Sequence, residues 1–170
     1  YRKGIVLKTT VVRRNSSEAH HPEAKSTSCL NQVLATLDPA PFGTHEILFL
    51  NQEGTLTEVR IGNFFILQKG RLLTPPAVGL LNGVTRRFVI KCARLGKIPV
   101  EERPITRHEL FNADEAFLTN TSWEILPIRE VDGRKVGSAL PGPLTIKLQT
   151  LFRRGVERET QNGKTKKSAH

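Results

Sequence analysis

Lys25 is the residue of this sequence best suited to covalent chemistry, provided that it is held next to a pocket. It stands at the expected start of a helix, directly before Ser26, Thr27 and Ser28. Desolvation or a neighbouring cation lowers the pKa of such a lysine, and its free amine can then form a Schiff base with a carbonyl compound. An ordinary surface lysine beside a helix N-cap is the alternative, and spacing along the chain does not decide between the two.

The stretch 51–87 contains two further features that could hold a small anionic ligand. Glu58 follows a turn, and the segment 82–86, NGVTR, is the expected start of a helix. The backbone N–H groups of Val84 and Thr85 and the positive end of the helix dipole would favour a phosphate there, and the Thr85 hydroxyl adds a donor. Alone this signal is weak, because every helix has such an end. We interpret the stretch as one wall of a binding site.

A mixture of strands and helices must position these residues. Apolar patterns of strand and helix period, separated by Gly, Pro and Asn turns, place strand pairs before and after single helices. This arrangement predicts a mixed α/β (α+β) fold in which helices pack outside one strongly bent sheet. We expect strands at 4–12, 45–50, 55–59, 63–68, 71–74, 98–103, 116–120 and 124–131, and helices at 24–38, 84–95, 106–110 and 143–153.

The first and last helices carry expectations about their ends and their buried faces. The helix at 24–38 must stop before Pro39 and Pro41, because proline cannot continue the helical hydrogen bonds. Beyond Gly155 the charged tail is expected to be disordered. The side chains expected to face inward are Leu30, Val33, Leu34 and Leu37 in the first helix and Leu144, Leu148, Leu151 and Phe152 in the last.

Length and composition limit the possible classes of protein. A chain of 170 residues that is 38% hydrophobic suits one domain with a sizeable core. Because it contains no Met, we expect that it is not a complete primary translation product. It shows no leader and no apolar run that could span a bilayer, so we expect a cytoplasmic protein, or one in an organelle matrix if a transit segment was lost. Cys29 and Cys92 provide neither a disulfide framework nor metal-ligand spacing.

The basic character of the chain raises nucleic acid as a partner. The formal net charge is +10 and the pI is about 10.1. The basic residues are scattered, however, and aromatic residues make up only 6%, which does not suit a stacking platform for bases. We therefore expect no nucleic-acid and no membrane partner, although such a surface would attract a small anionic ligand. The pair His20-His21 has no second ligand cluster, so no metal site is expected.

The combination of motifs resembles the class IV aminotransferases, the fold-type IV pyridoxal-phosphate enzymes. These include branched-chain aminotransferase, D-amino acid aminotransferase and aminodeoxychorismate lyase. The resemblance runs from about Gly4 to about Phe152 and is specific because several linked segments occur in order. After Lys25 these segments are LNQVLA, EILFLNQEGTLTE, GNFFILQKGRLLTPP, GLLNGVTRRFVI, ADEAFLTNTSWEILPI and DGRKVGSALPGPLT. The resemblance implies the barrel-like large domain of that fold.

The resemblance also implies roles for single residues around pyridoxal 5′-phosphate. Lys25 matches the catalytic lysine that forms the internal aldimine, a Schiff base, and then shuttles a proton. Glu58 matches the carboxylate that keeps the pyridine nitrogen charged, which makes the ring an electron sink. Arg14 could brace Glu58, and Asn63 matches a turn residue with a structural role.

The remaining cofactor contacts of the family fall on four further positions and one neighbour. Leu81 matches the residue that packs against one face of the ring. Val84 and Thr85 match the backbone and side-chain donors to the phosphate, and Thr121, with Asn120 before it, matches another phosphate ligand. The implied cofactor-binding set is therefore Lys25, Glu58, Leu81, Val84, Thr85, Asn120 and Thr121, with no metal.

The implied reaction is the transfer of an amino group between a branched-chain or D-amino acid and a 2-oxo acid. The alternatives are an aminodeoxychorismate lyase, which releases pyruvate with the same lysine, and a truncated domain that binds a cofactor or a partner without turnover. Residues 1–155 correspond to the C-terminal cofactor-binding domain of the family, without its N-terminal small domain, and 156–170 to the basic tail. In its full-length form the protein is expected to be a homodimer.

Overall fold

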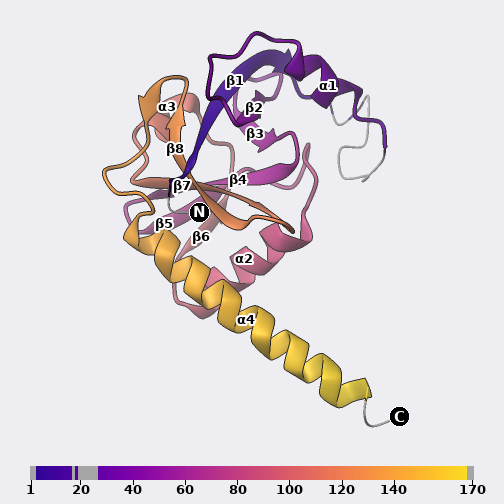
Figure 1. Ribbon diagram of the computed structural model, residues 1–170, viewed down its shortest axis with the longest axis vertical. Helices are drawn as coiled ribbons and strands as arrows, with labels where there is room; N and C mark the ends of the chain where they lie inside the picture. The colour runs from indigo at the N-terminus through magenta and orange to yellow at the C-terminus, as the bar shows by residue number, and fades with distance from the viewer. Residues whose placement is uncertain (1–2, 17, 19–26, 168–170) are drawn as a thin grey trace.

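The computed structural model describes residues 3–16, 18 and 27–167 (Figure 1). Side chains are described as far as residue 161. Lys25 and the His20-His21 pair therefore lie outside the described residues. Among those that are described, no helix combines the length and the apolar character that a membrane span requires.

Six strands close into a mixed barrel. The ring runs in the order β3-β2-β1-β8-β7-β4 and is closed by the antiparallel pairing of β3 with β4. β1 pairs in parallel with both of its neighbours, β2 and β8, while the other pairs of the ring are antiparallel. The six strands are β1 (Ile5–Arg13), β2 (Glu46–Leu50), β3 (Leu56–Val59), β4 (Gly62–Gln68), β7 (Glu115–Asn120) and β8 (Glu124–Val131).

Three short strands extend the barrel at its edges. β5 (Arg71–Thr74) forms a hairpin with β4, and β6 (Val100–Glu102) pairs in parallel with β5. β9 (Arg134–Lys135) pairs with the end of β8. The predicted hairpins at 45–59 and 63–74 are confirmed, the second turning at Lys69 and Gly70, which both have positive φ. The predicted bent, barrel-like mixed sheet is therefore confirmed.

Side chains alternate along β4 between two separate cores. Phe64 and Ile66 belong to the cluster to which all six barrel strands contribute. Phe65 and Leu67 belong to a second cluster, which also contains residues of α2 (Val84–Leu95) and α4 (Pro143–Lys167). Successive strand residues point to opposite faces, so β4 is buried on both sides. Figure 1 shows α2 and α4 together on one side of the barrel.

The short helix α3 (Arg107–Phe111) begins as the sequence predicts. The Thr106 side chain accepts a hydrogen bond from the Glu109 backbone, and the Glu109 carboxylate accepts one from the Thr106 backbone. This reciprocal capping box satisfies two backbone donors that a helix start leaves free. The helix contributes Leu110, which is buried in the barrel core.

The prediction for the first helix is wrong in its extent and in its buried face. Residues 27–29 are not helical, and α1 covers only Leu30–Thr36. The four side chains expected to face inward are instead 44% to 73% exposed, while Asn31 and Ala35 are buried. The physical reason is that Asn31 donates to the Arg13 carbonyl and accepts from Arg14, which turns the polar face of the helix toward the barrel. These four exposed residues are Leu30, Val33, Leu34 and Leu37.

The prediction for the end of the chain is also wrong, because the last helix does not stop near Arg153. α4 continues to Lys167, through most of the segment expected to be disordered. Gly155, beyond which the disordered tail was expected, lies instead inside the helix where α4 approaches α2: a Cβ there would be 2.8 Å from the Phe88 ring. The glycine therefore permits close helix packing. The inward positions of Leu144, Leu148, Leu151 and Phe152 are confirmed.

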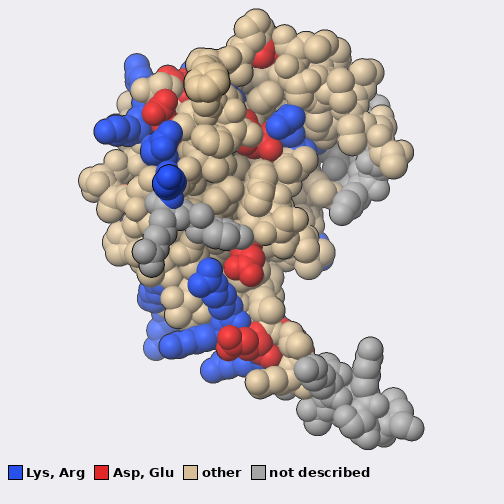
Figure 2. Space-filling model, in the orientation of Figure 1, with Lys and Arg blue, Asp and Glu red and all other residues tan. Residues whose placement is uncertain are grey.

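Charged side chains are distributed over the surface in several groups. On the face shown in Figure 2, Lys and Arg lie in separate groups with Asp and Glu beside them. Most of the ion pairs of the described residues lie at the surface, for example Lys91 with Glu159. No group of three or more His, Cys, Asp or Glu side chains that could hold a metal occurs in the described part of the chain.

Candidate functional site

A pocket of about 590 Å³ lies where the ends of β3 and β7 and the start of β4 meet the first turn of α2. Of the seven residues that the sequence analysis assigns to the cofactor, Lys25 is not described. All of the other six line this pocket: Glu58, Leu81, Val84, Thr85, Asn120 and Thr121. Residues that are far apart in the sequence are thus brought to one site by the closure of the barrel.

Glu58 is the buried acid of the pocket and is held by three donors. Arg14 Nη2 lies 2.5 Å from Glu58 Oε1, and the two side chains are 10% and 7% exposed. The backbone N–H of Leu81 donates to Oε2 at 3.2 Å, and Asn63 Nδ2 donates to the same oxygen at 3.4 Å. The predicted bracing of Glu58 by Arg14 is confirmed.

Burial raises the pKa of Glu58 to about 7. The charge of Arg14 and the hydrogen bond from Leu81 act in the opposite direction, as does the more distant charge of Arg86. Removing a carboxylate from water disfavours its charged form, and nearby cations favour it. Near neutral pH this carboxyl group is therefore partly protonated, and a further cation placed in the pocket would favour its ionised form.

Arg14 is itself fixed from several sides. Its Nη1 donates to Asn31 Oδ1 at 3.3 Å, and its guanidinium lies 5.6 Å from the centre of the Phe49 ring. Gln52 Nε2 donates to the Arg14 backbone carbonyl at 3.1 Å. Two of these contacts come from α1 and β2, so the guanidinium is held in place by the fold itself.

The segment 81–83 connects Glu58 to the start of α2. Asn63 Nδ2 donates to the Leu81 carbonyl at 2.8 Å, and the Gly83 backbone N–H donates to that same carbonyl at 2.8 Å. A Cβ at Gly83 would lie 2.4 Å from Asn63 Oδ1, so only glycine allows this approach. Asn63 therefore has the structural role that the sequence predicts, and it couples the buried acid to the helix start.

The first turn of α2 faces the pocket without a side-chain cap. Its N-cap is Gly83, and no side chain accepts from the first backbone N–H groups in the described residues. These N–H groups have no intrahelical partners in any helix. Val84 is 71% exposed and has an apolar side chain, so it can offer only its backbone N–H to a ligand. Thr85 is nearly buried and adds a hydroxyl group. The arrangement suits an anionic oxygen cluster.

Asn120 and Thr121 occupy different situations at the end of β7. The Asn120 side chain accepts from the backbone of Ser122 and Trp123 and donates to the Ile61 carbonyl, so it shapes the turn between β7 and β8. Thr121 is exposed and lines the pocket. Thr121 is therefore the better placed of the two to contact a ligand.

Among the lining residues that were not predicted from the sequence, Arg60 and Thr119 carry polar groups close to assigned positions. The Arg60 Nε lies 2.6 Å from the buried carboxylate of Glu46, which anchors this cation at the pocket edge. Thr119 also lines the pocket, and its buried Oγ1 has no hydrogen-bond partner among the described residues. Arg60 lies two residues after Glu58, and Thr119 directly precedes Asn120. This closeness to assigned residues was the signal that could have found them.

Comparison with known proteins identifies the family to which this chain belongs. The family model described as amino-transferase class IV matches residues 2–131. The chain belongs to the class IV aminotransferases. It is 40% identical over 151 residues to a putative branched-chain-amino-acid aminotransferase of Methanocaldococcus jannaschii, a match that covers 88% of this chain and 52% of the relative.

Solved structures of class IV aminotransferases have the same fold. A putative branched-chain amino acid aminotransferase from Thermotoga maritima matches with a TM-score of 0.84 and 35% identity, over 91% of this chain and 56% of that one. A branched-chain aminotransferase from the archaeon Thermoproteus uzoniensis, solved with norvaline, matches with a TM-score of 0.82 and 39% identity, over 89% and 50% of the two chains. The chain thus spans about half the length of the relatives that it matches.

Class IV aminotransferases use pyridoxal phosphate, and one of the matching branched-chain enzymes was solved complexed with N-(5′-phosphopyridoxyl)-L-glutamate. The donors of this pocket fit that group. A buried carboxyl group braced by a guanidinium suits a protonated pyridine nitrogen, and an uncapped helix start with an adjacent hydroxyl suits a phosphate. The glycine at position 83 lets Asn63 approach closely and hold the helix start in place.

Proposed function

We propose that this chain is the cofactor-binding part of a pyridoxal-phosphate-dependent aminotransferase that exchanges the amino group of a branched-chain amino acid with a 2-oxo acid. The observation that carries the proposal is the continuous path of contacts from Arg14 through Glu58 and Leu81 to the start of α2. This path provides a charged partner for a ring nitrogen at one end and a phosphate seat at the other. The named relatives at 30% identity or more support the branched-chain substrate.

Each polar group of the pocket has a defined task under this proposal. When bound, pyridoxal phosphate supplies the electron sink for the carbanion formed at the amino acid Cα. The Glu58 carboxylate holds a proton on the ring nitrogen, and Arg14 favours its ionised form and fixes its position. The backbone of Val84 and the backbone and hydroxyl of Thr85 bind the phosphate, as does Thr121.

Leu81 and Lys25 complete the assignment. The Leu81 backbone donates to Glu58, which holds this residue at the pocket wall. There its side chain would pack on one face of the bound ring. Lys25 holds the cofactor covalently and moves the proton between the substrate Cα and the cofactor. We extend the proposal to a homodimeric complete protein, in which chain outside this sequence contributes to the selection of the substrate.

The proposal is tested by an absorbance titration of the chain with pyridoxal phosphate. We expect a visible absorbance band of the lysine-bound cofactor that is absent in Lys25→Ala and retained in Lys135→Ala, whose lysine is exposed on β9. Reduction with borohydride followed by peptide mapping should place the adduct on Lys25. No band in the parent chain, or an adduct on another lysine, contradicts the assigned site.

A second measurement identifies the reaction class once the complete protein is available. For a transaminase, a branched-chain amino acid should convert the bound cofactor to its pyridoxamine form and release the corresponding 2-oxo acid. Release of pyruvate from aminodeoxychorismate without that conversion would identify a lyase instead. Cofactor binding with neither reaction would identify a non-catalytic binding protein.

A further inference from the structure

Arg86, in the first turn of α2, is a cation whose only effect described so far is to favour the ionised form of Glu58. The residue is only 1% exposed, although it does not line the pocket itself. Burying a guanidinium is costly unless its charge is paired and its N–H groups are hydrogen-bonded. The contacts of Arg86 therefore indicate what this position stabilises.

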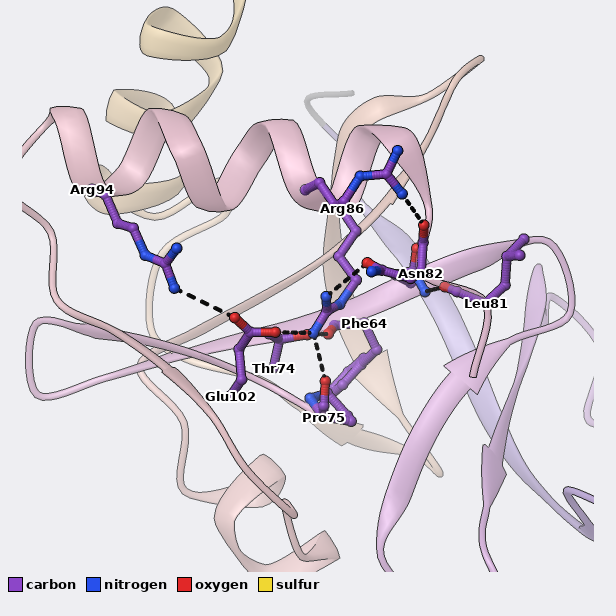
Figure 3. A network of polar contacts seen from close by, with 10 residues as sticks. Phe64, Thr74, Pro75, Leu81, Asn82, Arg86, Arg94 and Glu102 are labelled. Carbon is purple, nitrogen blue, oxygen red and sulfur yellow. Dashed lines mark hydrogen bonds and ion pairs between the residues drawn. The ribbon is translucent and has the colours of Figure 1, made fainter. Parts of the chain in front are cut away.

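The guanidinium of Arg86 joins three separate parts of the chain (Figure 3). Nη2 donates to the Pro75 carbonyl at 2.8 Å and to Glu102 Oε2 at 2.9 Å. Nη1 donates to Asn82 Oδ1 at 3.1 Å. Figure 3 shows the side chain reaching from α2 across to Pro75 and Glu102, with Asn82 beside it. Arg86 thus ties the segment before α2 to the chain that follows β5 and to β6.

These contacts hold the helix start in addition to those of Asn63. Asn63 fixes the Leu81 carbonyl, while Arg86 fixes the Asn82 side chain and Arg87 Nη1 donates to the Asn82 backbone carbonyl at 2.5 Å. The segment 81–83 is therefore held at both Leu81 and Asn82. Because Val84 and Thr85 follow it directly, the directions of their backbone N–H groups depend on this double attachment.

The charge of the first turn is the second observation. It contains Arg86 and Arg87 and no acidic residue, so the positive end of the helix dipole is reinforced. The Glu102 carboxylate is shared between Arg86 and Arg94, and Arg86 Nε has no hydrogen-bond partner among the described residues. Two arginines and no acidic residue in the first turn would destabilise an isolated helix, because positive charge is unfavourable at the positive end of the dipole. An anion bound at this helix start would offset it.

We propose that Arg86 is a positioning residue for the phosphate of the cofactor. It fixes Asn82 and Gly83 so that the N–H groups of Val84 and Thr85 converge on the phosphate, and its charge strengthens the field at that point. It does this without touching the phosphate. The proposal rests on the proposed function and makes a narrower claim, which is that Arg86 acts mainly on the phosphate end of the ligand, since its charge is the last of the named contributions to the pKa of Glu58 at the ring end.

The test compares pyridoxal phosphate with pyridoxal, which lacks the phosphate. Dissociation constants for both are measured by absorbance titration with the parent chain, Arg86→Met and Arg86→Lys. We expect Arg86→Met to weaken the binding of pyridoxal phosphate at least tenfold and that of pyridoxal less than twofold, with an intermediate loss in Arg86→Lys. Arg94→Met is the matched control, because Arg94 contacts the same carboxylate from an exposed position and should leave the preference for phosphate unchanged.

The outcomes separate this proposal from the proposed function. If Arg86→Met weakens both ligands by the same factor, Arg86 only supports the fold and the proposal is overturned, while the proposed function stands. If the parent chain binds neither ligand, the proposed function is overturned and this proposal with it. If circular dichroism shows that Arg86→Met is unfolded, Arg86→Lys and Asn82→Ala provide the decisive comparison, and an unchanged preference for phosphate in both overturns the proposal.

Discussion

The guanidinium of Arg14 and the carboxyl group of Glu58 meet at 2.5 Å inside the barrel wall, with both side chains about nine-tenths buried. Arg14 follows β1 and Glu58 lies in β3, which are not neighbours in the barrel, since β2 separates them. The pairing of β2 with both strands brings them within reach of each other. The pair therefore links the stability of the fold to the ionisation of the group that would contact the ring of the cofactor.

The unfolding free energy of the ligand-free chain should fall as the pH rises through about 7. The folded-state pKa of Glu58 is about 7 against 4.5 for a free side chain, so the folded state binds the extra proton between these values. The stabilisation is fully present below pH 4.5 and is lost above pH 7, and a difference of this size corresponds to about 3 kcal/mol. Urea unfolding between pH 5 and 8 measures it.

Glu58→Gln removes this titration and should flatten the pH dependence, whereas Glu53→Gln, which changes an exposed carboxyl group, should not. Saturating pyridoxal phosphate should also reduce the slope, because a protonated ring nitrogen favours ionised Glu58. An equal slope in the parent chain and in Glu58→Gln would show that another group carries the pH dependence.

Arg14→Met should destabilise the chain mainly at alkaline pH. Removing one partner of a buried ion pair typically costs about 3 to 5 kcal/mol, because it leaves an uncompensated charge. At pH 5 the loss should be smaller, since Glu58 is then protonated and needs no counter-ion. Arg13→Met is the matched control, because Arg13 is the exposed neighbour on β1. The same loss at pH 5 and pH 8 would indicate that packing against Phe49 dominates.

Much of the fold and of the pocket could be predicted from the sequence, because local rules determine both. The turn at Lys69 and Gly70, the capping box at Thr106 and the helix that starts at Val84 all depend on neighbouring residues. Of the six described site residues, Glu58, Val84 and Thr85 were indicated by a turn and a helix start, whereas Leu81, Asn120 and Thr121 were implied only by the family resemblance. Their assignment to parts of the cofactor remains a prediction.

The rest depended on contacts between distant segments, which no local pattern reports. The apolar stripe of α1 faces outward because Asn31 binds Arg13 and Arg14 across the sheet. Gly155 lies inside a helix, although glycine often marks a helix end, and its lack of a side chain suits the close approach of α2. The sequence analysis includes Arg86 only as the last residue of the expected helix start at 82–86. Its burial was not predicted, because it depends on contacts with Pro75 and Glu102.

Gly83→Ser should be destabilising, although serine is normally favoured at a helix N-cap. The added Cβ would lie 2.4 Å from Asn63 Oδ1, so the amide that holds the Leu81 carbonyl must move. We expect the steric conflict to lower the free energy of unfolding by about 1 to 3 kcal/mol, whereas serine capping would raise it by only about a few tenths of a kcal/mol. Thermal unfolding and the affinity for pyridoxal phosphate measure the two consequences. In an Asn63→Ala background the same substitution should cost much less, and an equal cost there would exclude the conflict with Asn63.

Gly155→Ala tests the packing of α4 against α2. Alanine is favoured over glycine inside a helix by about 1 kcal/mol, so an unobstructed position would gain stability. Here the new Cβ would lie 2.8 Å from Phe88 Cζ and 3.2 Å from Cys92 Sγ, and overpacking of this kind costs about 1 to 3 kcal/mol. We therefore expect a net loss in urea unfolding. In a Phe88→Ala background the conflict with the ring is absent, and the sign should reverse to a gain of up to about 1 kcal/mol. A gain in both backgrounds would show that the helices separate easily, and the close approach at Gly155 would then contribute little to the fold.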